Sequence, residues 1–178
     1  LRRRRRRGGP ARRGAAVNAR LAPSVTRRTM GVRDLDAVSG IEASAYSFPW
    51  TRGNFVDSLA AGYLAEVLED ETGRLLGYFI AMAGVDEMHL LNVTVAPAWQ
   101  GQGLGRLMLE ALAAHARGRG MASLWLEVRE SNRRARALYE QLGYAEVGLR
   151  RGYYPAAGRR EDAVVMSLVL QPGEAGEV

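Results

Sequence analysis

Residues 93–106 read VTVAPAWQGQGLGR, an apolar strand that passes through a glycine-rich turn into the start of an amphipathic helix. Gly101, Gly103 and Gly105 let a ligand approach the backbone closely. The first N–H groups of a helix have no partner within it, so they suit an anion such as a phosphate group. The spacing matches neither the Gly-x-Gly-x-x-Gly dinucleotide fingerprint nor a phosphate loop ending in Gly-Lys-Ser/Thr. On its own, therefore, the turn fits a phosphate site and an ordinary loop equally well.

Strands and helices are expected on both sides of this turn, and the length of 178 residues suits one domain. Asp34 and Thr51 are placed to cap the first two helices. Hairpins mixed with helix crossovers predict an α/β fold with a mixed sheet and helices on both faces. The predicted strands cover 25–29, 63–69, 75–84, 88–95, 123–128, 145–150 and 162–170, and the predicted helices cover 34–46, 51–61, 103–117 and 132–142.

Charge is distributed unevenly along the chain. All 25 basic residues are arginines, and eleven of them lie at or before Arg28, whereas residues 29–178 hold 14 arginines against all 19 acidic residues, a net charge of −5. We therefore expect an acidic folded domain over residues 25–170 that attracts a basic partner. Residues 1–24 are expected to be a disordered tail and residues 171–178 a flexible end. The tail is either an arm that contacts RNA or ribosomes or, as we favour, an accidental extension.

Several classes of protein are excluded by composition. There are no cysteines, which excludes a disulfide framework, a thiolate nucleophile and a Cys-ligated metal. His89 and His115 are isolated, so no metal site is expected. No apolar run approaches the ~18 residues that a membrane-spanning helix needs. We expect a cytoplasmic protein without a membrane partner, in which only the arginine-rich tail is a candidate for contact with nucleic acid.

Glu127 is the first candidate for proton transfer. It lies in a predicted strand whose apolar residues share one face, while Trp125 and Glu127 share the other. An α-amine has a pKa of about 8, so much of it must lose a proton before it can attack, and a nearby carboxylate can take that proton. A solvent-facing or salt-bridged glutamate is the alternative, and the residues alone favour it.

Tyr139 lies on an apolar helical stripe with Ala135 and Leu142. A tyrosine in such a position is usually a core residue, and its hydroxyl is then hydrogen-bonded at the edge of the core. The functional alternative is a proton donor to a departing thiolate. Asn132 begins the same helix, where its side chain either caps the helix or holds a ligand, and the sequence does not separate these roles.

Gln100-Gly101-Gln102-Gly103-Leu104-Gly105 resembles the Arg/Gln-x-x-Gly-x-Gly/Ala signature of the GNAT superfamily of N-acetyltransferases. The resemblance implies a mixed, mostly antiparallel twisted sheet of about seven strands with about four helices on its two faces. It also implies acetyl-CoA as the cosubstrate, and no metal. In this superfamily the strand before the turn splays away from its neighbour, and the pantetheine arm of the cofactor occupies the gap.

The resemblance assigns cofactor contacts to residues on both sides of the turn. Val93, Thr94 and Val95 would line the pantetheine arm, and an amide near Val95 would polarise the thioester carbonyl. Asn132 is a further candidate to hold the pantetheine. The pyrophosphate would lie on the backbone of the turn and the helix start, at Gly101, Gln102, Gly103, Leu104, Gly105 and Arg106.

Four further segments are informative: Trp125-Leu126-Glu127-Val128-Arg129, Ser131-Asn132, Ala137-Leu138-Tyr139-Glu140 and Leu142-Gly143-Tyr144. They resemble the RimI-type branch of the superfamily, which acetylates protein N-termini, and this resemblance covers residues 25–170. The resemblance makes Glu127 the general base and Tyr139 the general acid. The acceptor would be a protein N-terminal amine, the N-terminal alanine of a small-subunit ribosomal protein, and a lysine side chain, polyamine or other small amine is the alternative. A noncatalytic adaptor that binds RNA through the tail is a third hypothesis.

Two aromatic segments are candidates for the acceptor groove. Tyr153 and Tyr154 fall between the last two predicted strands, where the resemblance implies a loop that narrows the site for a flexible chain end. The alternative is a long hairpin whose tyrosines cover the sheet. Phe48 and Trp50 would form the opposite wall, although both could equally be packing residues.

Overall fold

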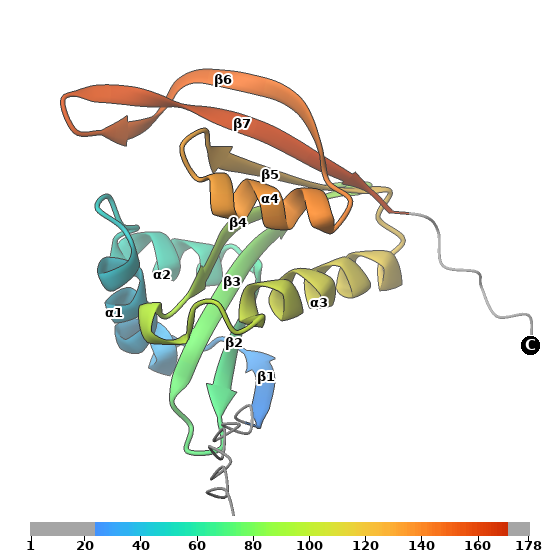
Figure 1. Ribbon diagram of the computed structural model, residues 1–178. Coiled ribbons are helices and arrows are strands. Elements are labelled where there is room, and N and C mark those ends of the chain that lie inside the picture. Colours follow the sequence, from blue (N-terminus) through green and yellow to red (C-terminus); the bar gives the residue numbers. More distant parts are fainter. Residues whose placement is uncertain (1–23, 171–178) are drawn as a thin grey trace, which may run out of the picture.

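The computed structural model describes residues 24–170 (Figure 1). The predictions for the arginine-rich tail and for residues 171–178 concern residues outside this range. Among the residues described, no helix combines the length and the apolarity that crossing a bilayer requires. The elements are β1 (Val25–Thr29), the 3₁₀ turn η1 (Val32–Asp34), α1 (Leu35–Ala45), α2 (Arg52–Ala60), β2 (Leu64–Asp70), β3 (Leu75–Ala83), β4 (Glu87–Val95), the 3₁₀ turn η2 (Pro97–Trp99), α3 (Leu104–Gly118), β5 (Ser123–Arg129), α4 (Arg133–Gln141), β6 (Ala145–Ala156) and β7 (Arg159–Val169).

The strands form one seven-stranded sheet in the order β1-β2-β3-β4-β5-β7-β6. Every neighbouring pair is antiparallel except β4 and β5, which run parallel and are joined through α3. Helices α1 and α2 lie on one face of the sheet, and α3 and α4 lie on the other (Figure 1). The predicted α/β class, with a mixed sheet and helices on both faces, is confirmed.

Two hydrophobic clusters fill the space between the sheet and its two helix layers. Alternation along β3 sends Phe79 and Ala81 into the cluster under α3, and Tyr78 and Ile80 into the cluster under α1 and α2. All four side chains are almost fully buried. A central strand with both faces covered reads as a continuous apolar run, which is why β3 is recognisable from sequence.

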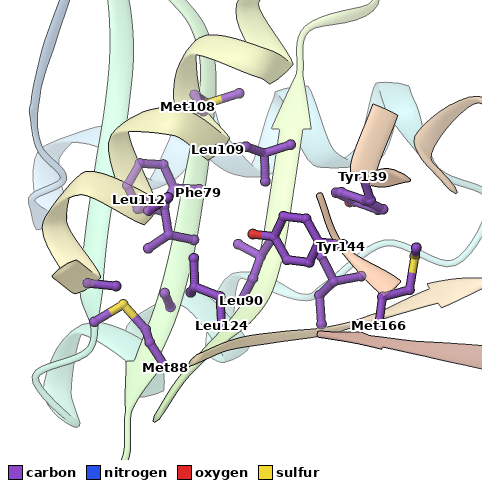
Figure 2. Close-up of a cluster of buried hydrophobic side chains, with 14 of the residues drawn as sticks. Phe79, Met88, Leu90, Met108, Leu109, Leu112, Leu124, Tyr139, Tyr144 and Met166 are labelled. Atoms are coloured by element: carbon purple, nitrogen blue, oxygen red, sulfur yellow. The ribbon is translucent and has the colours of Figure 1, made fainter. Parts of the chain in front are cut away.

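Helix α3 buries the stripe that its sequence predicts. Leu104, Met108 and Leu112 recur at intervals of four residues and all lie in the larger cluster. Figure 2 shows this cluster, with Tyr139 and Tyr144 on the side of it away from α3. The core therefore extends without a break from α3 to the residues that surround α4.

Asp34 differs from its predicted role as a helix cap. Its side chain makes no capping hydrogen bond to α1. Instead, its carboxylate accepts from the backbone N–H of Gly31 at 2.8 Å and pairs with both terminal nitrogens of Arg28 at 2.8 and 2.9 Å. Arg28 lowers the pKa of Asp34, because it stabilises the charged carboxylate. Thr51, by contrast, caps α2 as predicted, accepting from the N–H of Asn54.

The last two strands are longer than the sequence predicts. β6 and β7 form one long hairpin that includes Tyr153 and Tyr154, so these two residues do not lie in the expected loop between the last two strands. Gly152 has a positive φ of 58° at a register irregularity, and Pro155 lies in the edge strand. Both residues suggest a loop, but a bulge accommodates the glycine and an edge strand tolerates a proline.

Gly77 supplies a test of the close packing between β3 and β4. A Cβ at this position would lie 2.7 Å from the backbone carbonyl oxygen of Thr94 and 3.2 Å from Cε of Met108. We expect Gly77→Ala to lower the free energy of unfolding by about 1–3 kcal/mol, because the β4 backbone must move. Urea denaturation measures this change.

The matched control is Gly148→Ala in β6. Its new Cβ would meet only Val165, at 3.8 Å, which is an ordinary contact. We expect a change of no more than about 0.5 kcal/mol. Equal stabilities for the two variants would contradict a tight β3–β4 contact at Gly77.

Candidate active site

Strands β4 and β5 pair over only part of their length. The parallel pairing runs from Glu87 and Ser123 to Leu90 and Leu126, and the strands diverge beyond that point. A β-bulge lies at the same place, because Ala81 and Ile80 of β3 pair with Leu90 and Asn92 and leave Leu91 without a partner. The backbone of residues 91–95 therefore has no strand neighbour on its β5 side, which is the splayed geometry that the resemblance predicts.

Side chains partner the carbonyl groups along this open edge. The hydroxyl of Tyr46 donates to the carbonyl of Val93 at 3.3 Å, and Nε2 of Gln100 donates to the carbonyl of Val95 at 3.2 Å. Both carbonyls face the gap that β5 would fill if it continued alongside β4. An extended ligand that carries amide groups can pair with such an edge as an added strand would.

A cavity of about 570 Å³ adjoins the open edge, between β4, the start of α3, and α4. Among the predicted cofactor-binding residues, Gln102 and Thr94 do not line it. Those that line it are Val93, Val95, Gly101, Gly103, Leu104, Gly105, Arg106 and Asn132. Residues that the sequence analysis did not select also line it, including Tyr46, Trp99, Arg134 and Leu138.

The start of α3 provides an anion site within this cavity. Gly101 and Gly103 have φ values of 78° and 83°, which turn the chain so that α3 begins at the cavity. The backbone N–H groups of Leu104, Gly105 and Arg106 make no hydrogen bond to any residue of the described range. These groups, with the positive end of the helix dipole and the guanidinium of Arg106, fit a diphosphate.

Asn132 caps α4. Its side-chain oxygen accepts from the backbone N–H of Ala135 at 3.1 Å, and the residue also lies at the cavity wall. The capping role, which the sequence left open, is therefore present in the structure.

Thr94 lies on the opposite side of β4 from the cavity. The bulge at Leu91 reverses the alternation of the strand, so that Val93 and Val95 pack toward α3 while Thr94 faces α1. The hydroxyl of Thr94 lies 3.4 Å from a carboxyl oxygen of Glu42, and the whole residue is only 3% exposed. Its expected place beside a pantetheine arm is therefore not supported for the side chain.

Glu42 is a buried acidic residue that the sequence analysis missed. It is 2% exposed and lies in α1, where its carboxyl group accepts from the backbone N–H of Trp50 at 2.8 Å, from Nδ2 of Asn92 at 3.3 Å, and from the hydroxyl of Tyr78. Burial is the largest cause that raises the pKa of Tyr78, and the nearby carboxyl group of Glu42 adds to the effect. The available signal was that Glu42 falls four residues after Val38, on the apolar stripe of the helix.

Tyr139 reaches the 570 Å³ cavity from α4. It is 7% exposed, its ring centroid lies 5.7 Å from that of Tyr144, and its hydroxyl makes no hydrogen bond within residues 24–170. Burial is the main cause that raises the pKa of Tyr139, and the neighbouring Tyr46, Tyr144 and Tyr154 add to the effect. The phenol therefore keeps its proton at neutral pH, as a proton donor must.

Glu127 faces a second cavity, of about 360 Å³, on the other side of β5. Leu126 and Val128 point into the core, so alternation places Trp125 and Glu127 on the opposite face, as predicted. The carboxylate lies 3.0 Å from a terminal nitrogen of Arg150, and its side chain is 28% exposed. The salt-bridged alternative is thus present, in a residue that remains accessible from a cavity.

The predicted acceptor walls lie close together at Phe48 and Tyr154. The guanidinium carbon of Arg129 lies 5.9 Å from the Phe48 ring centroid and 4.5 Å from that of Tyr154, so it bridges the two rings. The hydroxyl of Tyr154 donates to the backbone carbonyl of Glu127 at 3.0 Å. The ring of Tyr153 contacts that of Tyr154 edge-on at 4.9 Å.

Trp50 has the packing role that was its alternative. Its ring lies 5.4 Å from the Phe55 ring and packs against the cluster under α1 and α2. Its backbone N–H donates to the carboxyl group of Glu42.

The open edge of β4 can pair with an extended arm that carries amide groups, and the start of α3 beside it suits phosphate groups. A donor molecule with both features would bring its acyl group to the gap between β4 and β5, so the fold and this cavity define an acyltransferase. Residues 35–144 match the acetyltransferase (GNAT) family, and the chain belongs to this family. It is an acetyl-CoA-dependent N-acetyltransferase. Among residues 24–170, no three His, Asp or Glu side chains converge as metal ligands would.

Several relatives match nearly their whole length. The chain is 43% identical over 145 residues to ribosomal protein bS18-alanine N-acetyltransferase of Escherichia coli strain K12, which covers 82% of this chain and 97% of that protein. It is 42% identical over 141 residues to the enzyme of the same name from Salmonella typhimurium. That match covers 79% of this chain and 95% of the Salmonella protein. The crystal structure of the ribosomal-protein-S18-alanine N-acetyltransferase from Escherichia coli superposes with a TM-score of 0.79 at 40% identity, covering 86% of this chain and 99% of that one.

The hydrogen bonds of Glu42 give a prediction for the stability of the site. We expect Glu42→Ala to lower the free energy of unfolding by about 3 kcal/mol, because the N–H of Trp50 and the hydroxyl of Tyr78 lose their acceptor while buried. Glu42→Gln keeps a carbonyl oxygen for the Trp50 N–H, so we expect less than half that loss. Chemical denaturation compares the two variants, and equal losses would show that hydrogen bonding is not what Glu42 contributes.

Proposed function

We propose that this chain transfers the acetyl group of acetyl-CoA to the N-terminal α-amine of alanine in ribosomal protein bS18. The observation that carries the proposal is the placement of Tyr139 and Glu127, one in each of two cavities on either side of the divergence of β4 and β5. The identity of 43% over nearly the whole length of the Escherichia coli enzyme supports the choice of acceptor.

The 570 Å³ cavity is the proposed cofactor site. The backbone edge at Val93 and Val95 would pair with the pantetheine amides, in place of the side chains of Tyr46 and Gln100. The diphosphate would lie on the turn and the first N–H groups of α3, beside Arg106. Acetyl-CoA supplies an acetyl thioester, which is activated toward attack by an amine. A backbone N–H near Val95 would polarise the carbonyl of that thioester.

Proton transfer divides between the two side chains. Glu127 accepts a proton from the α-ammonium group, directly or through water, so that the neutral amine can attack the carbonyl carbon. The C–N bond then forms as the C–S bond breaks, and Tyr139 gives its proton to the departing thiolate. The second proton that the nitrogen loses, on becoming an amide, restores the phenol of Tyr139 directly or through water. No covalent enzyme intermediate is needed, which agrees with a sequence that has no cysteine.

The acceptor would enter between Phe48 and Tyr154. Arg129 holds these two rings in place, and Tyr153 extends the same wall. A narrow entrance between aromatic side chains favours a flexible chain end over a lysine within a folded segment.

A mass-spectrometric screen tests the acceptor. The purified chain is incubated with acetyl-CoA and three classes of amine: peptides that begin with alanine, peptides whose α-amine is blocked and that contain a lysine, and spermidine. We expect acetylation of the alanyl peptides at a kcat/KM at least about a hundredfold above the others. Preferential acetylation of lysine or spermidine would replace the proposed acceptor with a side-chain or small amine.

The general-acid role of Tyr139 gives a prediction with a matched control. We expect Tyr139→Phe to lower kcat about a hundredfold, because general acids contribute factors of roughly 10²–10⁴, while acetyl-CoA binds with the same Kd. Steady-state kinetics and isothermal titration calorimetry measure the two quantities.

Tyr144→Phe is the control. Tyr144 contacts the Tyr139 ring, and its own hydroxyl is buried without a hydrogen-bond partner among the described residues, so losing that hydroxyl removes no reacting group. We expect its kcat to stay within about twofold of the parent. If the two variants were slowed alike, the effect would come from packing and not from a proton donor.

A further inference from the structure

Glu161 is an acidic residue of β7 that the proposed reaction does not use. Its side chain is only 14% exposed, and its two carboxyl oxygens have different partners. One oxygen accepts from the backbone N–H of Ser131 at 2.8 Å, and the other accepts from a terminal nitrogen of Arg129 at 3.0 Å. Arg129 ends β5, and Ser131 lies in the short loop that leads from β5 to α4. One carboxylate therefore joins β7 to the end of β5 and to the start of α4.

On the β5 side, Glu161 fixes the guanidinium of Arg129 between two aromatic rings. The guanidinium carbon lies 4.5 Å from the ring centroid of Tyr154 and 5.9 Å from that of Phe48. The nitrogen that binds Glu161 also donates to the backbone carbonyl of Pro155 in β6, at 2.9 Å. A guanidinium is planar and stacks on a ring only in a defined orientation, and directional hydrogen bonds set that orientation. The carboxylate thereby holds together the two rings of the proposed acceptor entrance.

On the α4 side, the carboxylate holds the backbone just before the helix begins. Ser131 lies two residues before the first residue of α4, the helix that carries Tyr139. The same loop has a second anchor, because the backbone N–H of Glu130 donates to the backbone carbonyl of Asp162 at 3.1 Å. This second bond does not involve the side chain of Glu161. Replacing that side chain therefore loosens the loop without detaching it from β7.

The carboxyl group of Glu161 is charged at neutral pH. Hydrogen bonding by Ser131 is the largest cause that lowers the pKa of Glu161, and the neighbouring Arg129 lowers it further. A charged carboxylate binds a guanidinium more strongly than a neutral group does. Within residues 24–170, Glu161 is the acidic side chain that pairs with Arg129. Removing its charge leaves this guanidinium without an ion pair there.

We propose that Glu161 is a positioning residue for acetyl transfer, which holds the acceptor entrance and the start of α4 in fixed positions relative to Glu127. This inference rests on the proposed function. Glu161 lines neither of the two cavities, so it acts through the residues that it binds. The hydroxyl of Tyr154, whose ring stacks on Arg129, donates to the backbone carbonyl of Glu127 at 3.0 Å. The entrance is thus joined to the strand of the general base, and α4 brings Tyr139.

Two substitutions separate the two attachments. Glu161→Gln keeps an oxygen for the N–H of Ser131 but loses the charge that pairs with Arg129, whereas Glu161→Ala loses both. With saturating acetyl-CoA, we expect Glu161→Gln to raise the KM of an alanyl peptide about fivefold and to leave kcat within about twofold. Glu161→Ala should raise KM similarly and also lower kcat about tenfold, because the helix that carries Tyr139 is held less firmly.

Two further measurements separate positioning from a general loss of structure. Calorimetric titration should give an acetyl-CoA Kd within about threefold of the parent for both variants, because the diphosphate site at the start of α3 is unchanged. Thermal unfolding followed by circular dichroism identifies variants that are folded at the assay temperature. If Glu161→Ala is unfolded there, Glu161→Gln alone decides. A folded Glu161→Gln variant with the KM of the parent would overturn the proposal.

Glu146→Gln is the matched control. The carboxylate of Glu146 also joins the β6–β7 hairpin to α4, through Nε of Arg136 at 3.1 Å, but it contacts neither Arg129 nor Ser131. We expect this variant to keep the KM and kcat of the parent. An increase in KM equal to that of Glu161→Gln would show that any weakened contact between the hairpin and α4 has this effect, and would overturn the specific role of Glu161.

Nuclear magnetic resonance measures the positioning without turnover. Protons of Arg129 lie between two rings and should show ring-current shifts, which are assigned by comparison with Arg129→Lys. We expect these shifts to shrink in Glu161→Gln and to persist in Glu146→Gln. Unchanged shifts in Glu161→Gln would overturn the proposal. A parent that acetylates lysine or spermidine in preference to alanyl peptides would instead overturn the proposed function, and the spectra would still decide whether Glu161 positions Arg129.

Discussion

The end of the pairing between β4 and β5, after Leu90 and Leu126, is the constraint on which the rest of the structure depends. Two strands that separate inside a sheet leave backbone polar groups without ladder partners, and buried groups of this kind must find others. Here the bulge at Leu91 marks the separation, and the side chains of Tyr46, which follows α1, and Gln100, in the turn before α3, partner the exposed carbonyls. The gap is stable because each layer of helices contributes to it.

The same divergence gives the enzyme two approaches to one reaction centre. Alternation along β5 turns Glu127 away from the core that holds Leu126, and α4 brings Tyr139 to the other side of the gap. Acyl donor and amine can then arrive from opposite sides, each beside the side chain that is proposed to handle its proton. Such an arrangement favours direct transfer, since neither substrate has to leave before the other binds.

Local sequence patterns predict part of the fold and of the candidate site. The amphipathic pattern that begins near Leu104 and the glycines before it depend on neighbouring residues, so the sequence predicts both the helix and the turn that precedes it. The register that leaves residues 91–95 unpaired depends on contacts between distant parts of the chain. Only the family resemblance predicts it. The bulge, which reverses the facing of Thr94, and the contact of Arg150 with Glu127, 23 positions earlier, have no local signature.

The side chains on the open edge also bear on how the cofactor gains access. The free N–H and C=O groups of an unpaired strand edge can pair with any extended chain, and proteins usually protect such edges. The bonds that Tyr46 and Gln100 make to Val93 and Val95 are long, at 3.3 and 3.2 Å, and Tyr46 is 40% exposed. Exchanging such bonds for those of a ligand amide costs little, because the carbonyls keep a donor throughout and the displaced side chains return to water. The edge is thereby protected in the absence of ligand and remains open to one that offers amides at the spacing of a strand.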